Sequence, residues 1–398
     1  METNFNPTQK RKTSATDILL WFSRIFVGLL FIFSGLIKAN DPMGFGYKLQ
    51  EYFLVFNLES LNDYTTWIAI VICGFEIILG TFLLLGLYGR SVARGLLLLI
   101  IFFTFLTFYS AFFEVVSSCG CFGDAIPLTP WQSFTKDLIL LAFILIIFKH
   151  KSKIEPIISK GSTRKLIVTI IIVISFGTGI YTSYFLPFID FLPYKEGKNI
   201  PEQMILPAGE QGDVYEYIYE LKNKTTGEIE KVTDKEYMNG LWEDKNLEVI
   251  GEPESHLVKK GYQIPISDLY ISDADGNEIT QEIVSNPYYN FVVVSTYIDK
   301  LSLADIIALD RINTSIRDLS TDYNLRAVLL TASSSQVASG LNEEMDLVLE
   351  TFYADAVPLK SMVRSNPGVL LLQNGVVIKK WSKFSFPSKK EIEKYLTK

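Results

Sequence analysis

Apolar residues dominate the first half of this chain, and charged residues gather in the second half. A helix needs ~20 mostly apolar residues to cross a bilayer. Five stretches come close to that length: residues 17–37, 66–87, 95–115, 132–149 and 166–187. The connections between them are too short to hold a domain. The pattern therefore predicts five membrane-spanning helices in a lipid bilayer, followed by a water-exposed region.

Lysine and arginine in the connecting segments predict the orientation of the bundle. They gather before the first span, between the second and third, and between the fourth and fifth, whereas the other two connections are acidic or mixed. With five spans, every basic segment falls on one side, which the positive-inside rule assigns to the cytoplasm. For a bacterial host, the sequence predicts a multi-pass inner-membrane protein with a cytoplasmic N-terminus and a periplasmic C-terminal domain.

The water-exposed region shows two patterns. From residue 201 to about 285, short strands alternate with turns. From residue 286, the order is strand, helix, strand, helix, hairpin and helix. We expect strands at 290–295 and 326–331, helices at 301–319, around 341–350 and at 388–396, and a hairpin that turns at Asn374-Gly375. The crossovers predict parallel strands in the first half and an antiparallel pair in the second.

The residues before the hairpin, Arg364-Ser365-Asn366-Pro367-Gly368-Val369, sharpen this prediction. The order of elements is similar to thioredoxin-like folds, which place a cis-proline here beside the active site, so the resemblance implies a cis bond before Pro367. The alternative is an ordinary proline that enters a strand. Active members carry Cys-x-x-Cys after the first central strand, where this chain has Thr296-Tyr297-Ile298-Asp299-Lys300-Leu301. No cysteine follows Cys121, so this domain serves for docking or is a degenerate relic.

The expected fold class is an α-helical membrane bundle of four spans plus a fifth, followed by an α/β thioredoxin-like extracytoplasmic domain. The expected divisions are a cytoplasmic N-terminus (1–16), a four-span bundle (17–150), a cytoplasmic loop with the fifth span (151–188), a β-rich segment (189–285) and the thioredoxin-like domain (286–398). A formal net charge of −7 without a basic patch argues against nucleic acid as a partner.

Cys119 and Cys121 stand one residue apart, directly after the third expected span. The predicted orientation places them outside the cytoplasm, where disulfides persist. A disulfide across so small a ring is strained, which raises its reduction potential and makes it a better oxidant. The pair is therefore a candidate catalytic dithiol. The alternatives are two small buried thiols at a turn, or part of a soft-metal site. His150 and His256 are the only histidines and are distant, so no metal site is predicted.

Glu76 lies inside the second expected span. A charged side chain at the bilayer centre costs roughly 2.5–3.5 kcal/mol on insertion scales, so such residues usually face the bundle interior and pair. Arg24 in the first span is the expected partner. This intramembrane pair is either a proton or ligand site or an interhelical structural contact. Lys136 and Asp137 begin the fourth span and are expected at the membrane interface.

Residues 18–148 resemble the DoxX and MauE families of four-span bacterial membrane proteins. The resemblance rests on a set of residues in the first two spans and on the cysteine motif, which favours MauE: Arg24, Gly28, Phe31, Ser34, Gly35, Lys38, Glu76, Gly80, Gly86 and Cys119-Gly120-Cys121-Phe122-Gly123. The whole layout is similar to DoxX-type proteins of Bacteroidetes. MauE implies a role in maturing a disulfide-bearing subunit of methylamine dehydrogenase, a substrate that we do not carry over.

Two functions fit these features best, and a small-molecule transporter is a weaker third because few charges are buried. In the first, Cys119 and Cys121 exchange disulfides with an exported protein, and the tail docks that partner or covers the cysteine turn. A membrane quinone is then the expected electron acceptor, by analogy with other membrane thiol oxidases, although no residue pattern identifies a quinone site. In the second, the bundle is a non-enzymatic anchor or assembly subunit, and the tail binds partners.

Overall fold

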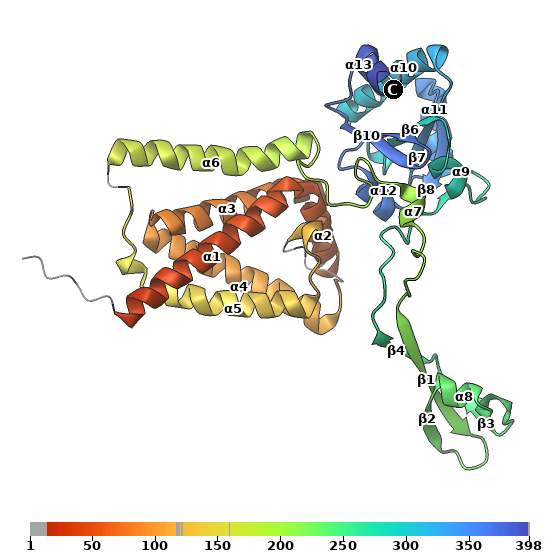
Figure 1. Cartoon of the computed structure of the whole chain (residues 1–398), viewed down its shortest axis with the longest axis horizontal. Helices are drawn as coiled ribbons and strands as arrows, with labels where there is room; N and C mark the ends of the chain where they lie inside the picture. The colour runs from red at the N-terminus through yellow and green to blue at the C-terminus, as the bar shows by residue number, and fades with distance from the viewer. Residues whose placement is uncertain (1–13, 117–119, 121, 159, 397–398) are drawn as a thin grey trace, which may run out of the picture.

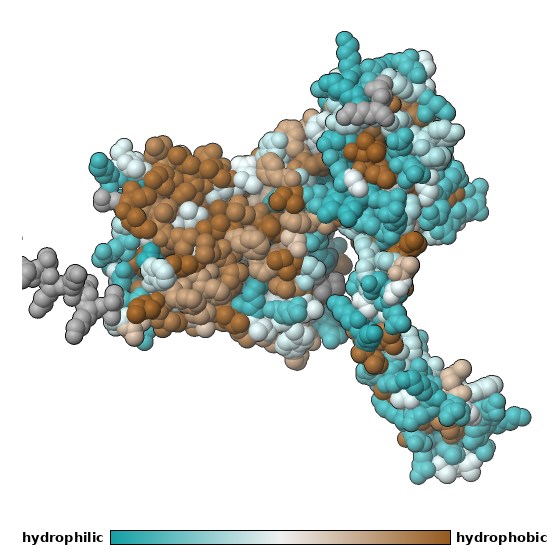
Figure 2. Space-filling view, viewed as in Figure 1, coloured by the Kyte–Doolittle hydropathy of each residue, from teal (hydrophilic) through white to brown (hydrophobic). Residues whose placement is uncertain are grey.

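The computed structural model describes residues 14–116, 120, 122–158 and 160–396 (Figure 1). Cys119 and Cys121 lie outside the described residues. Within them, five helices are long and apolar enough to cross a membrane, and Figure 2 shows their apolar side chains covering the bundle. These helices are α1 (Ala15–Asn40), α3 (Thr65–Leu85), α4 (Gly89–Phe113), α5 (Pro130–Lys149) and α6 (Gly161–Tyr184). The five-span prediction is confirmed.

Helices α1 and α3 run in opposite directions and pack at very short range. A methyl group on Gly80 would lie 2.7 Å from the carbonyl oxygen of Gly28, so only glycine allows these backbones to approach so closely. The pair α4 and α5 completes the four-span unit, and α6 lies along α3. Figure 1 shows α6 running beside the others at the edge of the bundle.

The two ends of the bundle differ. At one end, Asp17 near the start of α1 forms an ion pair with Lys153 in the connection before α6, at 2.8 Å. At the other end, a short helix, α2 (Pro42–Val55), follows α1 directly because Asp41 ends one helix and caps the next through the Gly44 amide, at 2.8 Å. This second end, which we call the α2 end, also carries Gly120 and the C-terminal region.

Two separate sheets follow the bundle. A four-stranded antiparallel sheet forms an arm that projects away from the rest of the C-terminal region in Figure 1. It contains β1 (Val214–Asn223), β2 (Ile229–Thr233), β3 (Leu247–Val249) and β4 (Glu254–Lys259), with the one-turn helix α8 (Asp234–Met238) beside them.

The second sheet has six strands in the order β10-β9-β6-β7-β8-β5. Strands β6, β7 and β8 are parallel, and β9 and β10 form the expected antiparallel hairpin with Asn374 and Gly375 in left-handed conformations. The strands are β5 (Ile271–Ser272), β6 (Tyr289–Val294), β7 (Leu325–Thr331), β8 (Glu350–Ala354), β9 (Gly368–Gln373) and β10 (Val376–Ser382). The Asn366–Pro367 bond directly before β9 is cis, so that prediction is confirmed.

Helices cover both faces of this sheet, as a thioredoxin-like fold requires. Alternate residues of β6 point to opposite faces: Phe291 and Val293 belong to the core beneath α10 (Leu303–Asp322) and α13 (Lys389–Leu396). Val292 and Val294 belong to the core that includes α9 (Thr280–Val284), α12 (Ala356–Met362) and Ile200 of α7 (Ile200–Gln203).

Two details of this region differ from the expectation. The helix expected around 341–350 lies earlier, as α11 (Ser335–Met345), and the sequence reading missed β8 and α12 after it. In addition, β5 and α9 belong to the thioredoxin-like core, so the 189–285 segment is not one unit. Short elements carry little periodic signal of their own, and their packing partners decide their conformation.

Candidate functional site

A cavity of about 430 Å³ lies between the α2 end of the bundle and the thioredoxin-like domain. Helix α2, the turn that contains Gly120 and Asp124, the tether that follows α6, and helix α12 all line it. Cavities of about 300–1,000 Å³ are typical of ligand sites. Cys119 and Cys121, the predicted catalytic residues, flank Gly120 in the sequence but lie outside the described residues.

Gly120 is held against helix α2. Its φ of +67° is a left-handed conformation that favours glycine, and a Cβ there would lie 3.2 Å from Lys48 Cγ. The residue between the two cysteines therefore accommodates both an unusual backbone and a close neighbour. This observation explains a glycine at position 120 independently of any chemistry at the cysteines.

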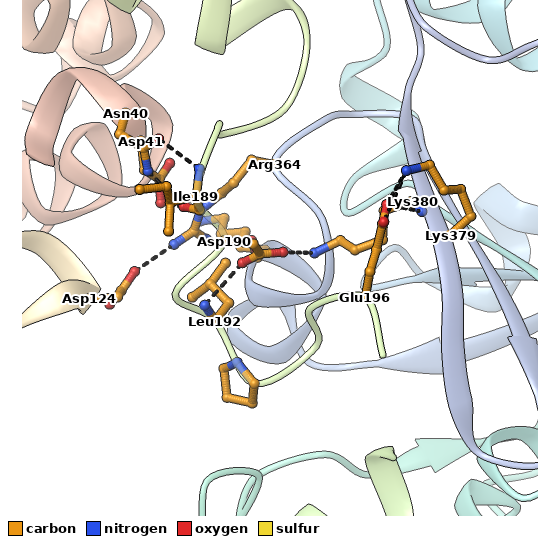
Figure 3. Close-up of polar contacts among 12 residues, drawn as sticks. Asn40, Asp41, Asp124, Ile189, Asp190, Leu192, Glu196, Arg364, Lys379 and Lys380 are labelled. Atoms are coloured by element: carbon orange, nitrogen blue, oxygen red, sulfur yellow. Dashed lines mark hydrogen bonds and ion pairs between the residues drawn. The ribbon is translucent and has the colours of Figure 1, made fainter. Parts of the chain in front are cut away.

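Arg364 joins the thioredoxin-like domain to the bundle. Its Nε lies 2.7 Å from Asp41 Oδ2, and its Nη2 lies 3.0 Å from Asp124 Oδ2. Its third nitrogen, Nη1, donates to the Lys360 carbonyl at 2.5 Å. The side chain is only 6% exposed, and Figure 3 shows it reaching from its own domain toward both carboxylates. We call Arg364, Asp41 and Asp124 the interface ion cluster.

Burial and neighbouring charges shift the pKa values of residues in and beside the interface ion cluster. Burial alone would lower the pKa of Arg364, but Asp41, Tyr47 and Asp124 outweigh it and raise that pKa. Burial raises the pKa of Tyr47 to about 12. Burial also raises the pKa of Asp124, against the opposing effect of Arg364. Burial, together with the positive charge of Lys300, lowers the pKa of Lys360.

The tether after α6 strengthens the same junction. Asn40 at the end of α1 exchanges two hydrogen bonds with the backbone of Ile189, at 2.8 and 3.0 Å. The next residue, Asp190, pairs with buried Lys380 at 2.6 Å (Figure 3). The fifth span is thereby connected both to α1 and to the hairpin of the thioredoxin-like domain.

The domain edge that faces the cavity is the one that carries the active site in thioredoxin-like folds. Asn366, in the cis-proline loop, accepts a hydrogen bond from the Thr296 amide at 2.8 Å. The stretch after β6 forms a one-turn 3-10 helix, η5 (Ile298–Lys300), in place of Cys-x-x-Cys. Lys360 Nζ lies 4.7 Å from the ring of Tyr47 on α2 and 6.0 Å from the ring of Tyr297. The edge that carries the cis-proline loop therefore faces the bundle.

Glu76 is buried inside the bundle, but its predicted partner is wrong. Its carboxylate lies 2.5 Å from Lys38 Nζ and accepts a hydrogen bond from Ser34 at 3.2 Å. Arg24 instead donates to the backbone carbonyls of Leu83 and Leu84.

Helix register explains this correction. Because α1 and α3 are antiparallel, Glu76 lies beside Gly35, and Leu84 lies beside Gly28. Arg24 precedes Ser34 by ten residues, which corresponds to about 15 Å along the helix. Arg24 thus reaches only the end of α3 that is remote from Glu76.

A second ion pair lies near the first. Asp137 is 1% exposed, pairs with Lys136 at 2.5 Å and accepts a hydrogen bond from Thr107 at 3.0 Å. Asp137 therefore faces the bundle interior, and its expected depth at the membrane interface stays a prediction. Both ion pairs line one small cavity of about 20 Å³, which Phe122 also borders. That volume holds about one water molecule.

The described residues contain no group of three or more His, Cys, Asp or Glu side chains placed to hold a metal ion. Cys73 is a free thiol buried in α3. The features that the described part of the chain offers for function are therefore the interdomain cavity, the interface ion cluster and the intramembrane ion pairs.

Together, the fold and the cavity define a class: a multi-pass membrane bundle with a thioredoxin-like domain docked on one end. Comparison with known proteins identifies the bundle more closely, because residues 16–149 match the family model of the methylamine utilisation protein MauE. The four-span part of this chain is therefore similar to MauE, and a domain with the strand order and cis-proline of a thioredoxin-like fold follows the fifth span.

Two individual proteins are also similar. Protein TlpB of Flavobacterium psychrophilum is 29% identical over 135 residues, which are 33% of this chain and 36% of that protein. The chain thus spans about a third of this relative. Among solved structures, the C-terminal domain of a protein assigned as a thiol-disulfide oxidoreductase from Bacteroides thetaiotaomicron is 15% identical. The match covers 32% of this chain and 90% of that domain, with a TM-score of 0.26.

Proposed function

We propose that this protein is a membrane thiol–disulfide exchange protein that acts through Cys119 and Cys121. The observation that carries the proposal is the position of their turn: Gly120 and Asp124 line the interdomain cavity, opposite the cis-proline edge of the thioredoxin-like domain. An exported partner would present its cysteines at this cavity. The MauE likeness of the bundle supports the same direction.

The proposed exchange transfers two electrons. A thiolate of the partner attacks one sulfur of the Cys119–Cys121 disulfide, and a mixed disulfide forms as the other sulfur leaves. The second thiolate of the partner then attacks the mixed disulfide. The partner leaves with a disulfide, and Cys119 and Cys121 remain as two thiols that have taken up two protons.

Reoxidation of the pair requires an acceptor of two electrons and two protons. We propose a membrane quinone, which would leave as the quinol. The distribution of basic residues supports an outward orientation of the cavity, because Lys153 lies at the end opposite Gly120 and the positive-inside rule favours the cytoplasmic side for basic connections. We propose, for a bacterial host, an inner-membrane location with a periplasmic C-terminal domain.

Thiol trapping in intact cells tests the proposal. In a Cys73→Ser background, the only remaining cysteines are Cys119 and Cys121, and their oxidation state can be read from acid quenching followed by maleimide labelling. We expect an oxidised pair in normal cells and a reduced pair in quinone-depleted cells. Cys121→Ser and Cys119→Ser should differ, since only the cysteine that bonds to the partner can form a lasting mixed disulfide: its thiolate attacks the disulfide of the oxidised partner, one partner sulfur leaves as a thiolate, and no second cysteine of this chain resolves the product.

The same experiment can overturn the proposal. If neither cysteine changes its labelling under any redox condition, and replacing both leaves the exported proteins fully oxidised, the exchange function fails. The non-enzymatic alternative, an anchor whose tail binds partners, has its own support in the absence of Cys-x-x-Cys from the stretch Thr296–Leu301. It predicts that the double serine variant retains full function.

A further inference from the structure

Arg364 precedes the cis-proline Pro367 by three residues, and its guanidinium donates at once to Lys360 on α12, to Asp41 at the end of α1 and to Asp124. Asp41 is the last residue before α2, and Asp124 follows Cys121 by three residues. We propose that Arg364 is a positioning residue that fixes the cysteine turn relative to the thioredoxin-like domain. The inference rests on the proposed exchange function and assigns a role to a residue of the degenerate domain.

The geometry favours positioning over simple adhesion. A guanidinium presents its N–H groups in one rigid plane, so three partners at fixed angles define one arrangement of the segments that carry them. Arg364 uses Nε for Asp41, Nη2 for Asp124 and Nη1 for the Lys360 carbonyl. Its plane also lies over the ring of Tyr47, 5.5 Å from the centroid. A lysine could bond one of these partners, but its ammonium could not hold all three partners in this arrangement.

The energetics point the same way. Removing an arginine from water is costly, and replacing a buried ion pair by apolar residues is often neutral or even stabilising. Apolar side chains alone would therefore suffice to attach the domain. The described part of the junction nevertheless places a 6% exposed guanidinium between two carboxylates. What this choice adds over an apolar contact is a fixed direction for Asp124, which follows Cys121 by three residues in the sequence.

The thioredoxin-like edge then has a specific use. In place of its own cysteines it presents Arg364, so the domain acts on a cysteine pair that another part of the chain supplies. Substrate proteins would meet the cysteines beside the edge that Arg364 connects to Asp124. The degenerate domain is in this view a part of the exchange site, since it sets the geometry of sulfurs that it does not contain.

The test compares Arg364→Gln and Arg364→Lys with Arg326→Gln in the full-length, Cys73→Ser protein in lipid nanodiscs. Arg326 is a matched control, because it also lies between two carboxylates, Glu282 and Glu350, within the same domain and away from the cavity. Hydrogen–deuterium exchange is measured for segments 41–55 and 356–368. In parallel, the equilibrium of the cysteine pair with glutathione and the rate of maleimide labelling of the reduced pair are determined.

We expect Arg364→Gln to raise exchange in both segments and to change the glutathione equilibrium and the labelling rate about tenfold or more, a ratio that corresponds to ~1.4 kcal/mol. Arg364→Lys retains the charge but should change the glutathione equilibrium and the labelling rate as Arg364→Gln does. Arg326→Gln should match the parent protein in all measurements. If exchange rises but both cysteine measurements stay unchanged, Arg364 merely attaches the domain and the positioning role is wrong. If neither changes, the cluster does not hold the junction at all.

Failure of the exchange function gives a different result. A pair that cannot equilibrate with glutathione in the parent protein contradicts the proposed function. The labelling rate of the reduced thiols still reports whether Arg364 controls the turn, since it requires only the thiols. An unchanged labelling rate in Arg364→Gln then overturns the positioning role independently.

Discussion

The buried ion pair inside the bundle and the ion cluster at the domain junction use the same kinds of side chain for different ends. Lys38 and Glu76 are both about 2% exposed and connect two neighbouring helices over short range. At the junction, Arg364 is equally hidden, but Asp124 is 47% exposed and the partners come from three distant parts of the chain. The first pair secures a bundle that already packs closely. The second determines how two separately packed units meet.

This difference determines which property is lost when each site is disrupted: the folding stability of the bundle or the docking of the domain. Within the bundle, removing one charge leaves the other in a low-dielectric interior, and the whole helix pair is affected. At the junction, water can reach the exposed carboxylate, so the folded units survive and their relative placement suffers. Substitutions should therefore separate effects on unfolding from effects on docking.

Glu76→Gln should give the largest loss of stability. The Lys38 ammonium then stays buried without that carboxylate, which typically costs ~3–5 kcal/mol. Thermal unfolding of the protein in detergent measures the effect. The double variant Lys38→Met/Glu76→Met is the control and should recover most of the loss, because an apolar pair leaves no buried charge. A double variant as unstable as Glu76→Gln would show that the pair is needed for more than its charge balance.

Asp41→Ala should give an intermediate effect that is confined to the junction. It removes the carboxylate that pairs with Arg364 and also caps α2 through the Gly44 amide. Loss of such a cap typically costs ~0.5–2 kcal/mol. We expect faster proteolysis of the tether at residues 185–199, whereas the thermal unfolding midpoint of the bundle should change little. If Asp41→Ala lowered the thermal unfolding midpoint of the bundle as far as Glu76→Gln does, the distinction between the junction and the bundle interior would be contradicted.

The sequence predicted the larger elements because each has a strong periodic or compositional signal. Five long apolar stretches indicated the spans, and Asn374-Gly375 indicated the hairpin. Residues before the hairpin predicted the cis bond at Pro367 through a family resemblance. By contrast, β8 and α12 are short and lie against other elements, so their conformation depends on contacts that no local pattern encodes.

The site was harder to predict, because it depends on register and on docking. Glu76 was correctly predicted in the bundle interior, but its pairing with Lys38 depends on how far α3 is shifted along α1, which no local pattern of the sequence encodes. The sequence singles out Arg364 only as part of the motif that contains Pro367. Nothing in the local sequence indicates that it meets Asp41, which lies 323 residues earlier.

A smaller effect tests the corrected register directly. Arg24→Met removes hydrogen bonds to the carbonyls of Leu83 and Leu84, and Glu76→Gln removes the pair with Lys38. Because these sites share no partner, a double-mutant cycle should give a coupling energy within ~0.5 kcal/mol of zero. Unfolding in detergent supplies the four stabilities. A coupling well above that limit would restore the Arg24–Glu76 pair that the register excludes.

The smallest expected effect concerns alkaline pH at the junction. Burial raises the pKa of Tyr47 to about 12, above the ordinary value of 10.0, so the folded protein retains the phenol proton after the unfolded chain has released it. The stability that this group contributes is therefore complete below pH 10 and declines as the pH rises from 10 toward 12. Tyr47→Phe lacks the titrating group but keeps the ring beneath Arg364 and Lys360. The melting-temperature advantage of the parent over Tyr47→Phe should thus shrink steadily between pH 9 and 11, and an advantage that stays constant across this range would mean that Tyr47 is not buried against the interface ion cluster.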